Sequence, residues 1–228
     1  MKSFLLLLLA GNGSRLYQDI GEKKQFTNIN DKPLFLYSLI SFLESKLFDK
    51  CVLVIAKEDE DIVVSYLKKF NISLENIILS YGGKTRNESV LNGLNTLIKL
   101  AKDEDKVFIH DAARPLIDVK TILEIYYKSL NLDGLTPIIK IDDSILSKEN
   151  GIKYVNRDKY FKVATPQVFT YSRIIEAYKN YDNLSTDDFS KLLNRGYKVD
   201  TILISKRTFK VTTIEDMFLL KAYLNIEK

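Results

Sequence analysis

The segment SFLLLLLAGNGSR, residues 3–15, runs from a continuous apolar stretch directly into a loop that contains two glycines. Continuous apolar runs are typical of strands that are buried on both faces of a parallel sheet. The run also imitates a short secretory signal, but it stops at Ala10 and no small-x-small cleavage site follows a long enough apolar region. We therefore interpret residues 4–9 as a first buried β-strand that enters a glycine loop.

The same pattern recurs along the chain and predicts the fold class. Further candidate strands lie at 51–56, 76–80, 106–110, 134–141 and 198–204. Helical patterns lie at 33–47, 59–70, 87–101 and 119–130, and a capping box at 213–216 begins a final helix. This alternation predicts a single α/β domain over residues 1–228, with a mostly parallel sheet and helices on both faces. Residues 142–165 are polar and irregular, which indicates a projecting β-arm.

Composition excludes several classes of protein. The chain has 228 residues, of which 46% are hydrophobic and 28% charged, as in ordinary globular proteins. Its net charge of +4 comes from scattered lysines, which indicates a solvated surface and no nucleic-acid partner. The single cysteine, Cys51, and the single histidine, His110, exclude an internal disulfide and a zinc site of the Cys/His kind. We expect a cytoplasmic protein with no membrane partner.

The loop after the first predicted strand has the features of a phosphate-binding site. Gly11 and Gly13 let the backbone approach a ligand, and Arg15 adds a fixed positive charge. The two lysines at 23–24 follow closely enough to bind the same anion. The dinucleotide-binding pattern G-x-G-x-x-G is incomplete, because Leu16 occupies the position of the third glycine. Taken alone, the loop is equally compatible with an ordinary tight turn.

A second glycine motif follows the third predicted strand. The two glycines at 82–83 permit close contact between the backbone and a ligand. Ser89 can hydrogen-bond the edge of a base or cap the next helix, and Asn87 is a further candidate for the cap.

The motif HDAARP, residues 110–115, lies at the carboxyl end of the fourth predicted strand, where ligands of open α/β sheets bind. The carboxylate of Asp111 suits Mg2+, a hard cation that pairs with carboxylate and phosphate oxygens. We expect Arg114 to hold this loop together by pairing with a carboxylate. Weaker signals in the last third of the chain lie at Arg157, 165–167, 186–188 and 210–213.

Together these motifs resemble the 2-C-methyl-D-erythritol 4-phosphate cytidylyltransferases of the non-mevalonate isoprenoid pathway. The matching motifs span residues 9 to 217 and are LAGNGSR, KKQF, GGKTRNES, HDAARP, DDS, TPQVF, TDD and FKVTTIEDM. The resemblance implies a Rossmann-like sheet and a homodimer in which the 142–165 arm reaches into the partner subunit. It also implies that CTP and a polyol phosphate are converted to a CDP-polyol and pyrophosphate.

The resemblance implies a role for each matching residue. The residues implied to bind the nucleotide are Ala10, Gly11, Gly13, Gly83, Ser89 and Ala112. The cations implied to stabilise the transition state are Arg15, Lys24 and Lys210. Asp111 is implied to hold Mg2+. Ser144 and Arg157 are implied to bind the polyol phosphate, Arg157 from the neighbouring subunit.

The chain departs from the family pattern at several positions, and these leave the acceptor open. Leu9 replaces an alanine, Lys23 replaces a proline, Ser144 replaces a threonine, and Lys84 stands where an acidic residue is often found. A closely similar family uses D-ribitol 5-phosphate. The glycine loops would also suit a nicotinamide-dependent oxidoreductase, which Leu16 disfavours, or a non-catalytic nucleotide-binding module, which would need fewer cations.

The chemistry of this reaction agrees with the nearly histidine-free composition. The acceptor phosphate is already anionic at neutral pH, so catalysis requires positioning and charge stabilisation rather than a general base. Phe209 and Val211 alternate with Lys210, so the three side chains cannot face the same way. We expect the two apolar side chains to turn inward and Lys210 to point toward the pocket.

Overall fold

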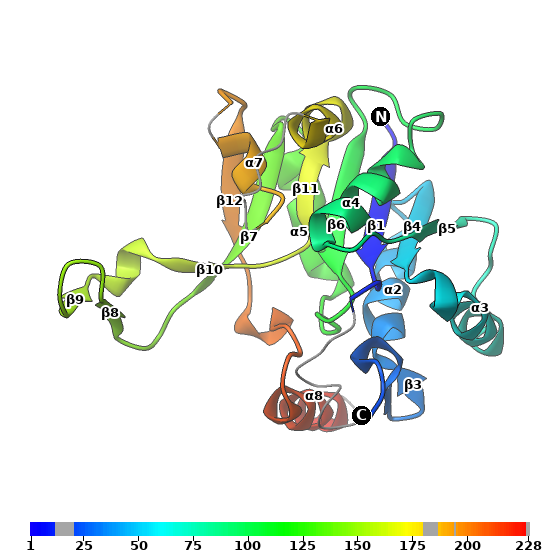
Figure 1. Ribbon diagram of the computed structural model, residues 1–228, viewed down its shortest axis with the longest axis horizontal. Coiled ribbons are helices and arrows are strands. Elements are labelled where there is room, and N and C mark those ends of the chain that lie inside the picture. The colour runs from blue at the N-terminus through cyan, green and yellow to red at the C-terminus, as the bar shows by residue number, and fades with distance from the viewer. Residues whose placement is uncertain (12–20, 180–186, 194, 227–228) are drawn as a thin grey trace.

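The computed structural model of the chain describes residues 1–11, 21–179, 187–193 and 195–226, and its centre is an eight-stranded sheet (Figure 1). The sheet consists of β1 (Ser3–Leu8), β4 (Lys50–Ile55), β5 (Ile77–Tyr81), β6 (Lys106–Asp111), β7 (Gly134–Lys140), β10 (Phe161–Val163), β11 (Gln167–Thr170) and β12 (Val199–Leu203). The order is β5-β4-β1-β6-β11-β7, and β10 and β12 also pair with β7. Only the pairs that involve β10 or β11 are antiparallel among these strands, which confirms the mostly parallel sheet.

Helices cover both faces of the sheet, as predicted. Leu5 and Leu7 of β1 pack in the same cluster as α2 (Leu34–Glu44), α3 (Glu60–Lys69) and α5 (Val119–Ser129). Phe4 and Leu6 point to the opposite face and pack with α4 (Arg86–Asn95), α6 (Tyr171–Lys179) and α7 (Ser190–Leu193). Successive side chains of a strand point to opposite faces, so an unbroken apolar strand supplies two cores. Each fully buried leucine contributes roughly 2 kcal/mol.

The helix that follows the second glycine motif is capped by Thr85, so the prediction of Asn87 as its cap is wrong. The Thr85 side chain accepts a hydrogen bond from the backbone N–H of Glu88, and Asn87 lies inside α4. The predicted capping box at the last helix, α8 (Ile214–Ile226), is confirmed. There the Asp216 carboxylate accepts from the backbone N–H of Thr213 at 3.0 Å.

The C-terminal segment packs below the carboxyl ends of the strands. Val211 is fully buried in a third apolar cluster with Met217 and Leu220 of α8, and Phe209 packs against this cluster. The Val211 backbone N–H donates to the Ala113 carbonyl at 2.8 Å, which joins this segment to the loop after β6. The remaining short elements are β2 (Asn28–Ile29), β3 (Lys32–Pro33), η1 (Lys24–Phe26), η2 (Lys57–Asp59), η3 (Arg157–Lys159) and η4 (Lys206–Thr208).

A two-stranded hairpin, β8 (Ile145–Ser147) with β9 (Lys153–Val155), projects away from the sheet (Figure 1). The projecting part is shorter than the predicted 142–165, because β10 pairs with β7 and belongs to the main sheet. Within the described part of the chain, no helix is both long and apolar enough to cross a membrane.

Candidate active site

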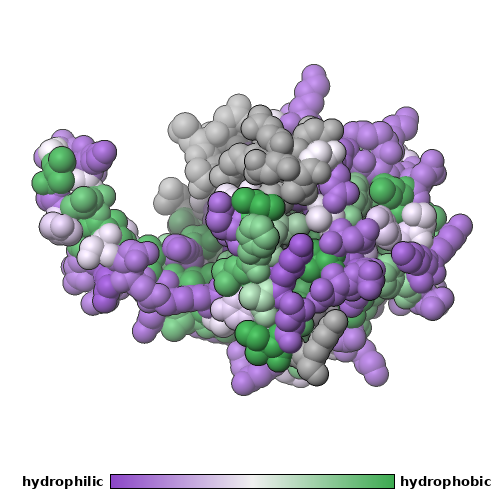
Figure 2. Space-filling view, turned by 90° about the horizontal axis from the view of Figure 1, so that it is seen from below, coloured by the Kyte–Doolittle hydropathy of each residue, from purple (hydrophilic) through white to green (hydrophobic). Residues whose placement is uncertain are grey.

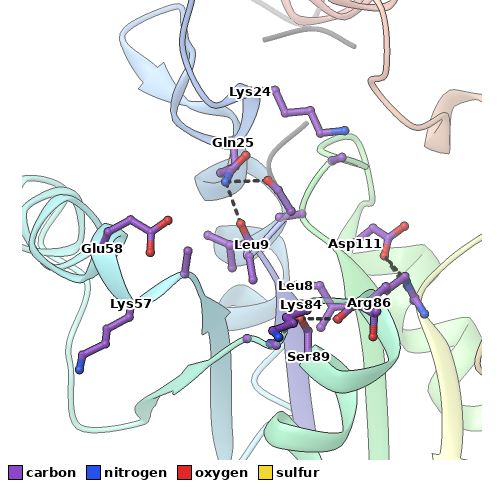
Figure 3. A pocket seen from close by; sticks show the side chains of 18 of the residues that line it. Leu8, Leu9, Lys24, Gln25, Lys57, Glu58, Lys84, Arg86, Ser89 and Asp111 are labelled. Atoms are coloured by element: carbon purple, nitrogen blue, oxygen red, sulfur yellow. Dashed lines mark hydrogen bonds and ion pairs between the residues drawn. The ribbon is translucent and has the colours of Figure 1, made fainter. Parts of the chain in front are cut away.

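A pocket of about 530 Å³ opens at the carboxyl ends of β1, β4, β5 and β6 (Figure 3). In parallel sheets these ends meet at one edge, where ligands bind. The predicted site residues that line the pocket are Ala10, Gly11, Lys24, Gly83, Ser89, Asp111, Ala112 and Lys210. Gly13 and Arg15 lie outside the described residues.

The described start of the first glycine loop is held in place by Gln25, which belongs to the matching motif KKQF. Gln25 is buried, and its Nε2 donates to the carbonyl oxygens of Leu9 at 2.8 Å and Gly11 at 3.2 Å. The second loop approaches the first because Gly82 has no side chain. A Cβ at Gly82 would lie 2.4 Å from the Cβ of Ala10, so only glycine fits there.

Ser89 supports the second glycine loop from below. Its Oγ accepts from the backbone N–H of Gly83 at 3.1 Å and donates to the carbonyl of Thr85 at 2.9 Å. A hydroxyl has one proton and two lone pairs. In this geometry the proton of Ser89 is used by Thr85, and one lone pair is left for a ligand in the pocket.

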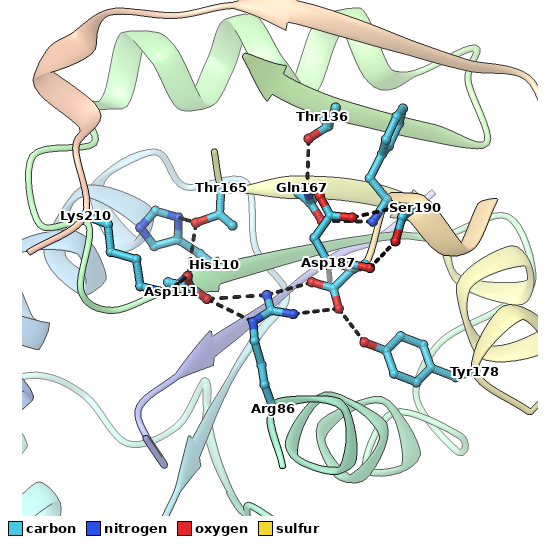
Figure 4. Close-up of polar contacts among 12 residues, drawn as sticks. Arg86, His110, Asp111, Thr136, Thr165, Gln167, Tyr178, Asp187, Ser190 and Lys210 are labelled. Carbon is cyan, nitrogen blue, oxygen red and sulfur yellow. Dashed lines mark hydrogen bonds and ion pairs between the residues drawn. The ribbon is translucent and has the colours of Figure 1, made fainter. Parts of the chain in front are cut away.

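The carboxylate of Asp111 lines the pocket and lies between two cations (Figure 4). Lys210 Nζ donates to Oδ2 at 2.6 Å, and Arg86 Nε and Nη2 approach Oδ1 at 3.4 Å. Burial tends to raise the pKa of Asp111, but Arg86 and Lys210 outweigh it and hold the pKa well below its usual range. Asp111 therefore stays ionised. Lys210 points toward the pocket, as predicted.

Arg86 joins Asp111 to a second, deeper carboxylate. Its Nη1 and Nη2 donate to the two oxygens of Asp188 at 3.0 and 2.8 Å. Asp188 is fully buried and also accepts from the hydroxyl of Tyr178. Burial alone would lower the pKa of Arg86, but the two carboxylates raise it above its ordinary value. Asp188 thus forms a buried ion pair with Arg86.

His110 lies fully buried beneath the pocket. Its Nδ1 is 3.1 Å from Thr165 Oγ1, and its Nε2 is 3.2 Å from the Arg114 carbonyl. Burial lowers the pKa of His110 to about 4, so the ring is neutral at pH 7. The same Thr165 hydroxyl accepts from the backbone N–H of Asp111 at 3.1 Å. His110 therefore orients Thr165, which in turn supports Asp111.

Two of the predicted basic contacts are wrong. Arg114 donates to the carbonyl oxygens of Thr208 at 2.9 Å and Val163 at 3.4 Å rather than to a carboxylate. The nearby carboxylate of Asp111 is already engaged by its two other cations. Lys23 bonds to the carboxylate of Asp59 at 2.8 Å and does not line the pocket, so its charge is paired within the protein instead of facing a ligand.

Lys24, in contrast, lines the pocket on the side of the C-terminal segment. Its Nζ donates to the carbonyl of Val211 at 3.1 Å, next to Lys210 in the chain. Two lysines that are 186 residues apart in sequence are thus brought to one wall of the pocket.

Ser144 and Arg157 are not part of this pocket. Both are exposed on the arm, where the Arg157 guanidinium donates to the carbonyl of Asp142. The arm projects away from the carboxyl ends of the strands (Figure 1). One chain therefore assembles those predicted nucleotide-binding residues that the structure describes, and it leaves the predicted acceptor-binding residues apart from them.

Comparisons with known proteins agree with this arrangement. Residues 4–226 match the family model of 2-C-methyl-D-erythritol 4-phosphate cytidylyltransferase. A protein of that name from Clostridioides difficile is 33% identical, over 98% of this chain and 94% of that protein. The protein of the same name from Clostridium novyi is 36% identical, over 95% of this chain and 94% of that protein. A crystal structure of 2-C-methyl-D-erythritol 4-phosphate cytidylyltransferase from Francisella tularensis is 25% identical, with a TM-score of 0.78 and 100% of both chains covered.

Proposed function

The chain belongs to the 2-C-methyl-D-erythritol 4-phosphate cytidylyltransferase family, and we propose on this premise that its pocket joins CTP to 2-C-methyl-D-erythritol 4-phosphate. The protein is a nucleotidyltransferase, and the reaction releases pyrophosphate in non-mevalonate isoprenoid precursor synthesis. The observation that carries the proposal is the ion pair between Asp111 and Lys210 in a pocket that described residues of both glycine loops also line.

The reaction requires an oxygen of the acceptor phosphate to attack the α-phosphorus of CTP while pyrophosphate leaves. No proton has to be removed from the acceptor, so the obstacle is the approach of two anions. Lys24 and Lys210 on the pocket wall supply fixed positive charge for the transition state. We assign the same role to Arg15, on the resemblance alone.

Asp111 is the residue that would hold Mg2+. Among the residues that the structure describes, no group of three acidic, histidine or cysteine side chains is arranged to hold a metal ion. Mg2+ is commonly held by one or two carboxylates together with substrate phosphates, and an ionised carboxylate in the pocket fits that donor set. When bound, the ion neutralises charge on the phosphates.

Cytosine would be read by Gly83 and Ser89. The Ser89 hydroxyl donates its one hydrogen bond to the carbonyl oxygen of Thr85, so toward a base it can act only as an acceptor. The 4-amino group of cytosine is a donor, whereas the oxygen of uracil at that position is an acceptor. This direction of hydrogen bonding favours CTP over UTP.

The acceptor would be bound by Ser144 and Arg157 from the arm of a second subunit. The arm exposes large apolar side chains, with Leu146 48%, Ile152 77% and Tyr154 77% accessible (Figure 2). A hairpin of two short strands is marginal when isolated, so a partner surface is expected to stabilise it. A homodimer in the cytoplasm, where CTP is available, would complete each pocket with Ser144 and Arg157 from its neighbour.

Pyrophosphate release is the direct test. Purified protein with CTP and Mg2+ is incubated with 2-C-methyl-D-erythritol 4-phosphate, and in parallel with D-ribitol 5-phosphate or no acceptor. We expect release only with the first acceptor. Release with D-ribitol 5-phosphate alone would reassign the acceptor, and no release with either would contradict the proposed function.

A further inference from the structure

The unexpected member of the pocket is Arg86, the first residue of α4. The amino-terminal end of a helix carries partial positive charge, so an arginine there is electrostatically unfavourable unless tertiary partners compensate. Arg86 has two such partners, Asp188 and Asp111. Its position is therefore explained by these two carboxylates and not by the helix.

The contacts of Arg86 are unequal, and the inequality shows which partner anchors it. Its bonds to Asp188 measure 2.8 and 3.0 Å and use both oxygens, and Asp188 is fully buried. Its two contacts to Asp111 measure 3.4 Å and share one oxygen. The guanidinium is thus fixed from the Asp188 side, and its remaining edge limits where the Asp111 carboxylate can lie.

The two oxygens of Asp111 are divided between its partners. Oδ1 faces Arg86, and Oδ2 bonds to Lys210 at 2.6 Å. Lys210 has a flexible stem, whereas Arg86 has a planar fork held by a buried partner. If Lys210 turns to the α-phosphate, Oδ2 becomes available to a cation while Oδ1 keeps its contact with Arg86.

We infer that Arg86, anchored by Asp188 and Tyr178, is a positioning residue that orients the Asp111 carboxylate for a divalent cation bound with CTP. The inference rests on the proposed role of Asp111 as the metal ligand. Arg86 acts through Asp111 and needs no contact with the reacting atoms. Asp188 does not line the pocket and bonds to the Arg86 guanidinium through both of its oxygens, so its effect on the metal would pass through the guanidinium.

The test compares Arg86→Lys and Asp188→Asn with the wild-type protein. Lysine keeps the positive charge but cannot form the two-pronged contact, and asparagine removes the anchoring charge. Mn2+ binding is measured by electron paramagnetic resonance with CTP present and no acceptor, and the Mg2+ concentration for half-maximal turnover is measured separately. We expect both variants to weaken Mn2+ binding about tenfold and to raise the Mg2+ midpoint similarly, as for other residues that orient a metal ligand.

Controls separate orientation of the metal ligand from general damage to the fold. Arg173→Lys changes an arginine that pairs with Asp133 at 3.3 Å outside the pocket, and it should leave Mn2+ binding unchanged. The double variant should bind Mn2+ no more weakly than the more damaging single variant, because both changes break one connection. Tyr178→Phe is the mildest change, because it removes only the hydroxyl donor to Asp188, and it should weaken Mn2+ binding about twofold. This variant tests the inference even if the other variants fail to fold.

The result also distinguishes this inference from the proposed function. Mn2+ affinity within the measurement error of wild type in folded Arg86→Lys and Asp188→Asn, with affinity lost in Asp111→Asn, would overturn the inference alone. Unchanged Mn2+ affinity in Asp111→Asn would overturn the metal role of Asp111 and the inference with it.

Discussion

The pocket and the arm differ in how completely one chain builds them. In and directly behind the pocket, four charged groups are paired within the chain: Asp111 and Asp188 face Arg86 and Lys210 at distances of 2.6 to 3.4 Å. On the arm, Ser144 and Arg157 are exposed, and apolar side chains near them face solvent. The charged groups of the pocket are thus paired within one chain, whereas the polar and apolar side chains of the arm are exposed.

This difference indicates how the two substrates are recognised. Binding residues that are anchored in a rigid sheet are pre-organised, which lowers the ordering cost of binding. The nucleotide would meet such a site on one subunit. The polyol phosphate would meet a site completed by a second subunit, so acceptor binding would depend on assembly. The following changes test each half of the comparison.

The largest effect is expected from Asp111→Asn. The change is nearly isosteric but removes the charge that a hard cation requires, so Mg2+-dependent turnover should be abolished. The circular dichroism spectrum should remain that of a folded α/β protein. Turnover is measured by pyrophosphate release over a range of Mg2+ concentrations. Turnover by the wild-type protein in excess chelator would contradict a metal role for this carboxylate.

The next largest effect is expected from Lys210→Ala. A cation needed mainly in the transition state affects kcat more than nucleotide binding. We expect kcat to fall by about 100-fold or more, by analogy with loss of a single charge-stabilising donor. The affinity for CTP, measured by calorimetry, should change less. A near wild-type kcat at saturating substrates would exclude Lys210 from the catalytic set.

A mixing experiment tests whether the arm acts in a second subunit. Arg157→Ala and Lys210→Ala should each be nearly inactive alone. In a mixed dimer, one pocket would combine its own intact Lys210 with the partner's intact Arg157. Random mixing makes half of the dimers mixed, with one working pocket in each, so about a quarter of wild-type activity should return. Activity that stays at the level of the single variants after subunit exchange would show that the arm serves its own chain.

The fold was predictable because its signals are local. The unbroken apolar run of β1 indicated a strand buried on both faces, and both faces are indeed covered. The position of Lys210 was predictable for a related reason. Val211 is fully buried and Phe209 packs nearby, so alternation directs the lysine the other way.

The electrostatic part of the site was not predictable, because its partners are far apart in sequence. Arg86 and Asp188 are separated by 102 positions, and although TDD at 186–188 is one of the matching motifs, nothing in it indicates that Asp188 pairs with Arg86. The wrong partner for Arg114 has the same origin. Its sequence neighbourhood offered Asp111, but Arg86 and Lys210 arrive from elsewhere in the fold and occupy that carboxylate. Glycine motifs mark a site, whereas ion pairs within it require the fold.

The smallest effect concerns the pH dependence of stability, which should come from the sheet domain and not from the arm. The chain has one histidine, His110, and burial lowers its pKa to about 4, below the ordinary value of about 6.5. Below pH 6.5 the unfolded chain takes up a proton at this residue while the folded chain does not. The contribution of neutral His110 to stability is therefore complete above pH 6.5 and is lost as the pH falls toward 4. The full difference in unfolding free energy is about 3 kcal/mol.

Urea unfolding of the wild-type protein at pH 6.5, 5.5 and 4.5 should show this decline in stability. The variant His110→Asn should show a smaller slope of stability against pH, most clearly between pH 6.5 and 5.5, where most carboxylates remain ionised. Parallel slopes for the two proteins would mean that His110 takes up protons alike in the folded and unfolded states, and that burial against Phe42 and Thr165 does not lower its pKa.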